Sequence, residues 1–408
     1  MNQEEDKKHR FLWSMRLLRG HMRLRMICRK TTVVAVTGSC AKTSTTAFLG
    51  KIFSDRTTCF VGVHFNSRRP VLRNVLNVKP SQRIYLQEVS GGVPGSLVSL
   101  MRLLRPRIAI VTTIGLDHYV AFRSLEAVAK EKGHLVSALP ASGTAVLNAD
   151  DPYVLAMAGR TKARVLIYGR CEGADVRATE VEAAWPQRLS LTINYQGVSA
   201  RIKTNLFGDL AVTSLLAAVA GGLAAGFDLE TCAESLQGVE AFERRMALKQ
   251  TPNGIWFVDD TLKAPYWSVE KVVALFEHAT APRKTLVFGS FSDTSGSDSP
   301  KYRATARTAL AVADRVVFVG KKAQYIRKMM TPETEGRLFV FDTPKESARF
   351  LVDHALKDEL VLVKSNCLEH LERLILEQAG PVKCWKEVCS TQSRCDQCEA
   401  SGILANGV

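Results

Sequence analysis

The chain has 408 residues, enough for two or three domains, and its 46% hydrophobic and 23% charged content is ordinary for a globular protein. No apolar run approaches the ~20 residues that span a bilayer, and no secretory signal is visible, so we expect a cytoplasmic protein. The net charge of +15 suits polyanionic small molecules, but the aromatic-basic interleaving of nucleic-acid-binding proteins is absent, so no nucleic-acid partner is expected.

The amino terminus carries much of the positive charge. Residues 1–30 hold nine Lys or Arg against three Asp or Glu, and residues 9–30 mix arginine with large apolar side chains. This pattern predicts a basic amphipathic helix. Such a helix either makes peripheral contact with an anionic membrane surface or packs on the first domain with its arginines in solvent.

The next stretch has the layout of a phosphate-binding loop. Residues 32–36 form a β-branched apolar run typical of a buried parallel strand, and a helical pattern covers 43–52. Between them the candidate nucleotide-binding residues are Gly38, Ser39, Cys40, Ala41, Lys42, Thr43 and Ser44. Small residues let backbone N–H groups approach phosphates, the lysine reaches the terminal phosphates, and the threonine hydroxyl can ligate Mg²⁺. The alternative is an ordinary tight turn between strand and helix.

Strand and helix patterns then alternate along the chain. Strands are expected at 58–62, 83–88, 107–113 and 144–148, helices at 95–104 and 125–139, and a loop at 64–80. Glu88 ends its strand, where open α/β sheets place their ligands. Residues 164–206 suggest a small antiparallel flap, and 205–226 a long buried helix. This alternation predicts an α/β fold with a mostly parallel sheet around the phosphate loop.

A second α/β domain follows. Strands expected at 255–260, 285–289, 315–320, 337–341 and 359–363 are separated by helical patterns, which predicts a smaller Rossmann-like carboxyl-terminal domain. The expected organisation is therefore a basic segment at 1–30, a central domain at 31–245, a carboxyl-terminal domain at 246–380 and a cysteine-rich tail at 381–408.

The tail contains four closely spaced cysteines, Cys384, Cys389, Cys395 and Cys398. Four thiolates within fifteen residues can form a tetrahedral Zn²⁺ site, although only the last two have the preferred spacing. The alternative is a flexible tail with free, oxidisable thiols.

Seven motifs in sequential order resemble those of the Mur ligase family, whose members form amide bonds with ATP. They are Thr37–Ser44, Glu88, Thr113–His118, Phe122–Glu126 with Glu131–Gly133, Leu147–Asp151, Asp259–Ala264 and Leu362–Ser365. Within the family, the motifs are most similar to those of the subgroup that adds D-alanyl-D-alanine to the muramoyl tripeptide. The resemblance covers about residues 32–375 and implies a ligase that forms an acyl phosphate and releases ADP and phosphate.

The resemblance also implies roles for individual residues. In the central domain Thr43 and Glu88 would hold one Mg²⁺, which prefers oxygen ligands, and His118 would help to hold a second. Lys132 matches the lysine that is carbamylated in the family. The alternative interpretation of Lys132 is a solvated lysine on a helix, and that of His118 is a helix-capping or core histidine.

In the carboxyl-terminal domain Asp260 resembles the residue that contacts the ATP ribose. Arg245, with Arg244 as competitor, resembles an arginine that reaches the phosphates. Lys263 would lie near the acyl phosphate, where a cation stabilises the transferring group; a surface lysine is the alternative. Because the contacts come from two domains, ATP is expected to draw the domains together.

Three departures from the family pattern affect the prediction. Only about 30 residues precede the phosphate loop, so the UDP-sugar-binding domain is not expected and a standard UDP-muramoyl substrate is doubtful. The helix opening at 208–214 lacks the family's polar residues near adenine. Ala41 replaces a glycine at a position that requires positive φ, which would strain the loop.

The sequence therefore predicts an Mg²⁺- and ATP-dependent ligase that couples a small-molecule carboxylate to an amino acid or peptide amine. The alternatives are a membrane-associated ligase for a polymer or specialised metabolite, and a catalytically weakened nucleotide-binding scaffold. Lys42, His118, Lys132 and Lys263 are the expected catalytic residues.

Overall fold

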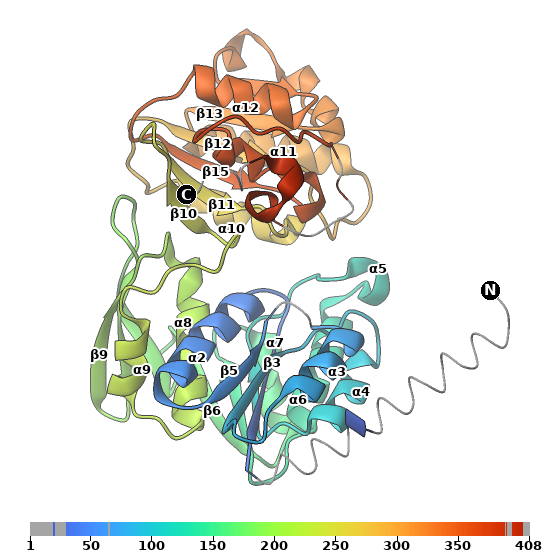
Figure 1. The fold of residues 1–408 in the computed structure, drawn as a ribbon, viewed down its shortest axis with the longest axis vertical. Coiled ribbons are helices and arrows are strands. Elements are labelled where there is room, and N and C mark those ends of the chain that lie inside the picture. The colour runs from blue at the N-terminus through green and yellow to red at the C-terminus, as the bar shows by residue number, and fades with distance from the viewer. Residues whose placement is uncertain (1–18, 21–29, 64–65, 388, 390–393, 403–408) are drawn as a thin grey trace, which may run out of the picture. The chain divides into compact units, whose positions relative to one another are not determined.

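A computed structural model describes residues 19–20, 30–63, 66–387, 389 and 394–402 (Figure 1). The predicted basic helix at 9–30, with its proposed membrane contact, lies outside the described residues except at three positions. The chain forms two compact units. Of the described residues, the first unit contains those up to 181, 190–203 and 211–239, and the second contains 182–189, 204–210 and those from 240 onward. In the described part of the chain, no helix has the length and apolar character that crossing a membrane requires.

The first unit is built on a nine-stranded sheet with the order β2-β3-β1-β4-β5-β6-β7-β8-β9. The strands are β1 (Thr32–Thr37), β2 (Cys59–Gly62), β3 (Ile84–Glu88), β4 (Ile108–Val111), β5 (Thr144–Asn148), β6 (Arg164–Gly169), β7 (Val176–Glu182), β8 (Ser190–Tyr195) and β9 (Val198–Lys203). Strands β1 to β6 pair in parallel, whereas β8 and β9 pair antiparallel. The mostly parallel sheet predicted from the sequence is confirmed.

Helices cover both faces of this sheet. They are α2 (Lys42–Arg56), α3 (Arg68–Asn77), α4 (Ser96–Leu104), α5 (Tyr119–Phe122), α6 (Leu125–Ser137), α7 (Pro152–Leu155), α8 (Val212–Ala224) and α9 (Leu229–Leu236). Helices α2, α8 and α9 pack together, and α3, α4 and α6 pack over the opposite face of the sheet (Figure 1). Helix α8 is apolar nearly all round because it lies between α2 and the sheet, and most of its side chains are buried.

The second unit has a six-stranded sheet with the order β10-β11-β15-β12-β13-β14. Its strands are β10 (Ala247–Gln250), β11 (Trp256–Asp260), β12 (Lys284–Phe288), β13 (Arg315–Val319), β14 (Leu338–Phe341) and β15 (Leu360–Lys364). Its helices are α10 (Val269–Ala274), α11 (Asp298–Val312), α12 (Pro344–Asp353) and α13 (Arg373–Leu376). One apolar core lies beneath α10 and α11 and a second beneath α12 and α13, so this unit too is a doubly covered α/β sheet.

Two local predictions differ from the structure. Residues 64–80, expected to form a loop, contain helix α3, whose Val71, Leu72 and Val75 are buried against the sheet. Residues 164–206, expected to form a small antiparallel flap, do contain the antiparallel pair β8–β9, but this pair extends the large sheet through β6 and β7. In helix α3, burial against the sheet outweighs the local signal from polar and proline residues.

Candidate active site

The loop after β1 takes a conformation that two small residues determine. Gly38 has φ of 149°, and a Cβ at this position would lie only 1.9 Å from Thr112 Oγ1. Ala41 has φ of 67° and precedes the first residue of α2. The sequence-based expectation of positive φ at Ala41 is confirmed, and this alanine adopts a backbone conformation that favours glycine.

Hydrogen bonds attach the loop to the segment after β4. Ser39 N donates to Thr113 O at 2.7 Å, and Cys40 N donates to Thr113 Oγ1 at 3.1 Å. Ser39 Oγ donates to Gly115 O at 3.0 Å. The amides of Ser39 and Cys40 thus bond within the protein. The N–H groups of Thr43 and Ser44 lie in the first turn of α2, where a helix offers no internal acceptor and attracts anions.

The two side chains that follow the loop are held in place by neighbouring oxygens. Lys42 Nζ folds back and donates to Gly38 O at 2.5 Å and to Ser39 O at 3.3 Å. Thr43 Oγ1 donates to Glu88 Oε2 at 3.1 Å, and Asn66 Nδ2 donates to Glu88 Oε1 at 2.8 Å. The structure therefore brings the predicted metal ligands Thr43 and Glu88 together. Two adjacent oxygen donors of this kind fit Mg²⁺.

A buried lysine and aspartate form the second part of the site. Lys132 and Asp117 are 0% and 1% exposed, and Lys132 Nζ lies 3.9 Å from Asp117 Oδ2. His118 has φ of 54°, and its Nε2 lies 3.6 Å from the same carboxylate oxygen. Lys132 is thus not the solvated helix lysine of the alternative interpretation. Sequence reasoning missed Asp117, although it adjoins His118 in the same motif.

Glu131 fixes the helix that carries Lys132. Its carboxylate caps the amino terminus of α4 by accepting hydrogen bonds from Gly95 N at 2.6 Å and Leu97 N at 2.8 Å. Ser96 Oγ donates to the same carboxylate at 3.1 Å. Helix α6 is thereby bound to α4, and Lys132, the next residue, is turned toward Asp117.

These groups belong to one edge of the large sheet. In the register of the parallel strands, Val36 pairs with Glu88 and Thr37 pairs with Val111. The loops after β1, β3 and β4 therefore leave neighbouring strands at the same carboxyl edge. This edge is the usual ligand-binding edge of an open α/β sheet.

The second unit has polar groups at the carboxyl ends of two adjacent strands. Asp260 of β11 pairs in register with Lys364 of β15, and the two buried side chains form an ion pair. In the loop after β11, Lys263 Nζ lies 3.5 Å from Asp293 Oδ2, and the Lys263 side chain is 32% exposed. The predicted ribose-binding residue thus ends strand β11, and the predicted cationic residue lies in the loop that follows it.

The structure separates the two neighbouring arginines. Arg244 is buried and donates from Nε to Thr261 Oγ1 at 2.9 Å, while its Nη2 lies 3.2 Å from Glu372 Oε2. Arg245 is only partly buried, and its Nε has no hydrogen-bond partner among the described residues. Arg244 therefore has a structural role within its unit, which leaves Arg245 as the candidate for phosphate contact.

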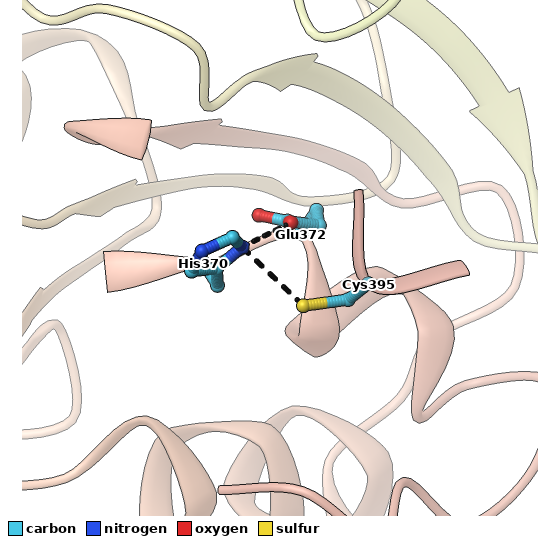
Figure 2. Close-up of side chains that lie close together, drawn as sticks. All are labelled: His370, Glu372 and Cys395. Atoms are coloured by element: carbon cyan, nitrogen blue, oxygen red, sulfur yellow. Dashed lines mark hydrogen bonds and ion pairs between the residues drawn. The ribbon is translucent and has the colours of Figure 1, made fainter. Parts of the chain in front are cut away.

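The tail cysteines do not gather into one four-sulfur cluster. Among the described residues, the converging donor group of the second unit contains Cys395 together with His370 and Glu372 (Figure 2). Cys384, Cys389 and Cys398 are not part of that group, and the nine described cysteines are all thiols. Sequence spacing could not identify His370 or Glu372, because they precede Cys395 by more than twenty residues.

Two family profiles match the chain. The profile described as the Mur ligase middle domain matches residues 36–222, and the profile described as the Mur ligase, glutamate ligase domain matches residues 244–367. These matches cover the phosphate loop, the Lys132 region and the strand-end residues of the second unit.

Curated relatives include a UDP-N-acetylmuramoyl-tripeptide–D-alanyl-D-alanine ligase from Mycobacterium tuberculosis, 34% identical over 171 residues. That alignment covers 42% of this chain and 34% of the relative, so the chain matches about a third of its length. An enzyme of the same name from Bacillus subtilis is 25% identical over 305 residues, covering 74% of this chain and 65% of that protein.

Solved structures share the fold. MurF from Acinetobacter baumannii superposes with a TM-score of 0.78 at 23% identity, covering 88% of this chain and 78% of that chain. MurF from Thermotoga maritima in complex with ADP has a TM-score of 0.77 at 19% identity, and the superposition covers 89% of this chain and 82% of that chain. At these identities the likeness shows the fold alone.

Proposed function

We propose that this chain, which belongs to the Mur ligase family, is an ATP-dependent ligase that joins a carboxylate to an amine through an acyl phosphate. One observation carries the proposal: a phosphate loop, the Thr43–Glu88 oxygen pair and the buried Lys132–Asp117 pair belong to one edge of one sheet. An ordinary strand-to-helix turn requires neither a buried lysine nor two adjacent oxygen donors.

The reaction explains these residue types. A carboxylate oxygen attacks the γ-phosphorus of ATP, which gives an acyl phosphate and ADP; the amine then attacks the acyl carbon, and phosphate leaves with that oxygen. Two anions must meet in the first step, so cationic groups must offset their repulsion. Lys42 Nζ would exchange its hydrogen bonds to backbone carbonyl oxygens for contacts with the phosphates. The first turn of α2 would offer backbone N–H donors to the same phosphates.

Thr43 and Glu88 would hold the Mg²⁺ that accompanies ATP. When bound, the ion supplies positive charge to the β- and γ-phosphates. Asn66 would keep the Glu88 carboxylate oriented, because it binds the oxygen that does not contact Thr43.

Lys132 would act as a carbamate. Carbamylation converts a buried ammonium into an anion, and the new carboxylate would face Asp117 and His118. Two neighbouring anions are stable in a buried site only with a cation between them, so the modified lysine would complete a second Mg²⁺ site with His118.

In the second unit Arg245 would contact the phosphates, Asp260 the ribose and Lys263 the acyl phosphate. Asp260 ends strand β11 and Lys263 lies in the loop after it, which favours their contribution to one ligand.

The substrate pair is the finer part of the proposal. The names of the relatives give a UDP-linked muramoyl tripeptide and D-alanyl-D-alanine, which makes this pair the first to test. The second class is carboxylates that carry no UDP, coupled to amino acids or dipeptides.

The proposal is tested by phosphate release from Mg·ATP with a panel of both substrate classes, using Lys42→Ala as the matched inactive variant. We expect release that requires both a carboxylate and an amine and falls to the background level in the variant. Nucleotide binding without release on any pair would favour the scaffold alternative.

Two finer predictions concern the ends of the chain. Residues 9–30 would bind anionic vesicles peripherally, which cosedimentation of the full chain with phosphatidylglycerol vesicles tests; equal recovery with neutral vesicles would reject it.

For the tail, the zinc prediction narrows to Cys395, the only tail cysteine within a converging donor group among the described residues.

A further inference from the structure

We propose that His370, Glu372 and Cys395 form a Zn²⁺ site that anchors the carboxyl-terminal tail to the second unit. The three side chains come from two segments: the loop after β15 supplies the imidazole and the carboxylate, and the short helix Cys395–Gln397 supplies the thiol. Figure 2 shows them converging on one point. This site is separate from the residues of the proposed ligase reaction and does not depend on that proposal.

The donors are buried and close together. His370, Glu372 and Cys395 are 1%, 4% and 9% exposed. Glu372 Oε1 lies 2.8 Å from His370 Nδ1, and Cys395 Sγ lies 3.3 Å from the same nitrogen. One donor atom from each residue lies within 4.8 Å of the other two. Nitrogen, oxygen and sulfur donors of these types are the ligands of protein zinc sites.

The distances between the donor atoms are close to those that a bound zinc ion would require. Zinc bonds of about 2.0–2.1 Å to nitrogen and oxygen and about 2.3 Å to sulfur, in tetrahedral geometry, separate N from S by about 3.5 Å and N from O by about 3.3 Å. The donor atoms would move apart by about 0.2 and 0.5 Å, within the freedom of side-chain torsions.

The geometry argues against a catalytic Cys–His–Glu triad. In such a triad the thiol and the carboxylate bind opposite nitrogens of the imidazole, so that one orients the ring and the other exchanges a proton. Here both contacts involve His370 Nδ1. The Cys395 thiol is also buried, so a substrate could not reach it. Three donors around one centre are the arrangement of a metal site.

Two arginines supply the surrounding support. Arg244 Nη2 lies 3.2 Å from Glu372 Oε2, which leaves Oε1 to face the imidazole. Arg373 is buried and donates from Nε to His370 O at 3.0 Å. Its Nη1 and Nη2 donate to Cys384 O at 2.8 Å and Lys386 O at 2.7 Å. One side chain thus holds both the loop and the incoming tail, as expected of groups that orient metal ligands.

A divalent cation would also be compatible with the charges of these three ligands. Zn²⁺ with one carboxylate, one thiolate and a neutral imidazole gives a neutral centre. The fourth position belongs to water or to Cys398, which has the Cys-x₂-Cys spacing relative to Cys395.

The first test uses the full chain without any substitution. After production with zinc, elemental analysis should find one zinc per chain. X-ray absorption should show one sulfur and three nitrogen or oxygen neighbours, or two sulfurs if Cys398 is the fourth ligand. A centre of four sulfurs, or a chain that binds no zinc in a competition with a metal indicator, would overturn the proposal.

The second test compares variants by Co²⁺ titration, in which a thiolate ligand gives a near-ultraviolet charge-transfer band. Cys395→Ser should abolish the band, and His370→Gln and Glu372→Gln should weaken Co²⁺ binding by about 100-fold or more. Cys384→Ser is the matched control within the tail and should bind as the unmodified chain does. Loss of binding in Cys384→Ser with retention in His370→Gln would instead support the four-cysteine site. Circular dichroism of each variant checks that it is folded.

Discussion

Lys132 Nζ lies 3.9 Å from Asp117 Oδ2, and both side chains are almost completely buried. An unmodified lysine at this position offsets the aspartate charge, whereas a carbamylated one adds a second anion. The carbamylated pair would therefore differ from the unmodified pair by two units of charge. A bound cation would favour the carbamate, so modification of Lys132 would depend on metal binding.

The first prediction is that activity depends on dissolved CO₂. Lys132→Met should lower kcat/KM by about 100-fold or more, because the anionic ligand is lost. The unmodified chain should lose activity in CO₂-depleted buffer and recover it with bicarbonate, and Lys130→Met, on the exposed face of the same helix, should behave like the unmodified chain. Bicarbonate-independent turnover by the unmodified chain would exclude the carbamate.

The second prediction concerns backbone strain at the phosphate loop. Ala41→Gly should raise the free energy of unfolding by about 1 kcal/mol, because Ala41 has φ of 67°. Ala211→Gly is the matched control: Ala211 also precedes a helix but has φ of −74°, so glycine there should lower stability by about 0.5–1 kcal/mol. Urea denaturation measures both values, and equal destabilisation would show that Ala41 is not strained.

The third prediction separates metal binding from nucleotide binding. Glu88→Gln keeps the size of the side chain but removes a charge from the Thr43–Glu88 pair. We expect the Mg²⁺ concentration for half-maximal activity to rise by about 10-fold or more. Binding of ATP without Mg²⁺, measured by calorimetry, should not weaken, since one repulsive anion is gone. Weaker metal-free binding would mean that Glu88 contacts the nucleotide directly or supports the loop.

The fourth prediction uses the cysteines as reporters. Cys40, in the phosphate loop, and Cys171, outside it, are both exposed. Mg·ATP should slow the alkylation of Cys40 and leave that of Cys171 unchanged, as followed by peptide mass spectrometry. Burial raises the pKa of the Cys232 thiol to about 12, so Cys232 should remain unlabelled at pH 8 in both conditions. Equal protection of Cys40 and Cys171 would indicate a general conformational change instead.

The sequence was informative where one local signal decides the structure. The strands β1, β3 and β5 were predicted to within one or two residues because apolar runs define buried parallel strands. Positive φ at Ala41 followed from its place in the loop. Helix α3 was missed because its arginines and proline resemble a loop, and its buried side chains are stabilised by contacts distant in sequence.

Side-chain partners depended on the tertiary structure. Glu131 was known only as a neighbour of Lys132, and its capping of α4 is a contact between residues about 35 positions apart. His370 and Glu372 could not be grouped with Cys395 from spacing, because the loop and the tail meet only in the folded unit. The choice between Arg244 and Arg245 likewise required their burial and contacts.

The most direct measurement follows an oxygen atom. A carboxylate substrate labelled with ¹⁸O is turned over with Mg·ATP and an amine, and the released phosphate is analysed by mass spectrometry. The account predicts one ¹⁸O transferred to phosphate for each amide bond formed, because the carboxylate oxygen becomes the bridge of the acyl phosphate. Phosphate that instead gains its oxygen from water, with the label retained in the carboxylate, would contradict it.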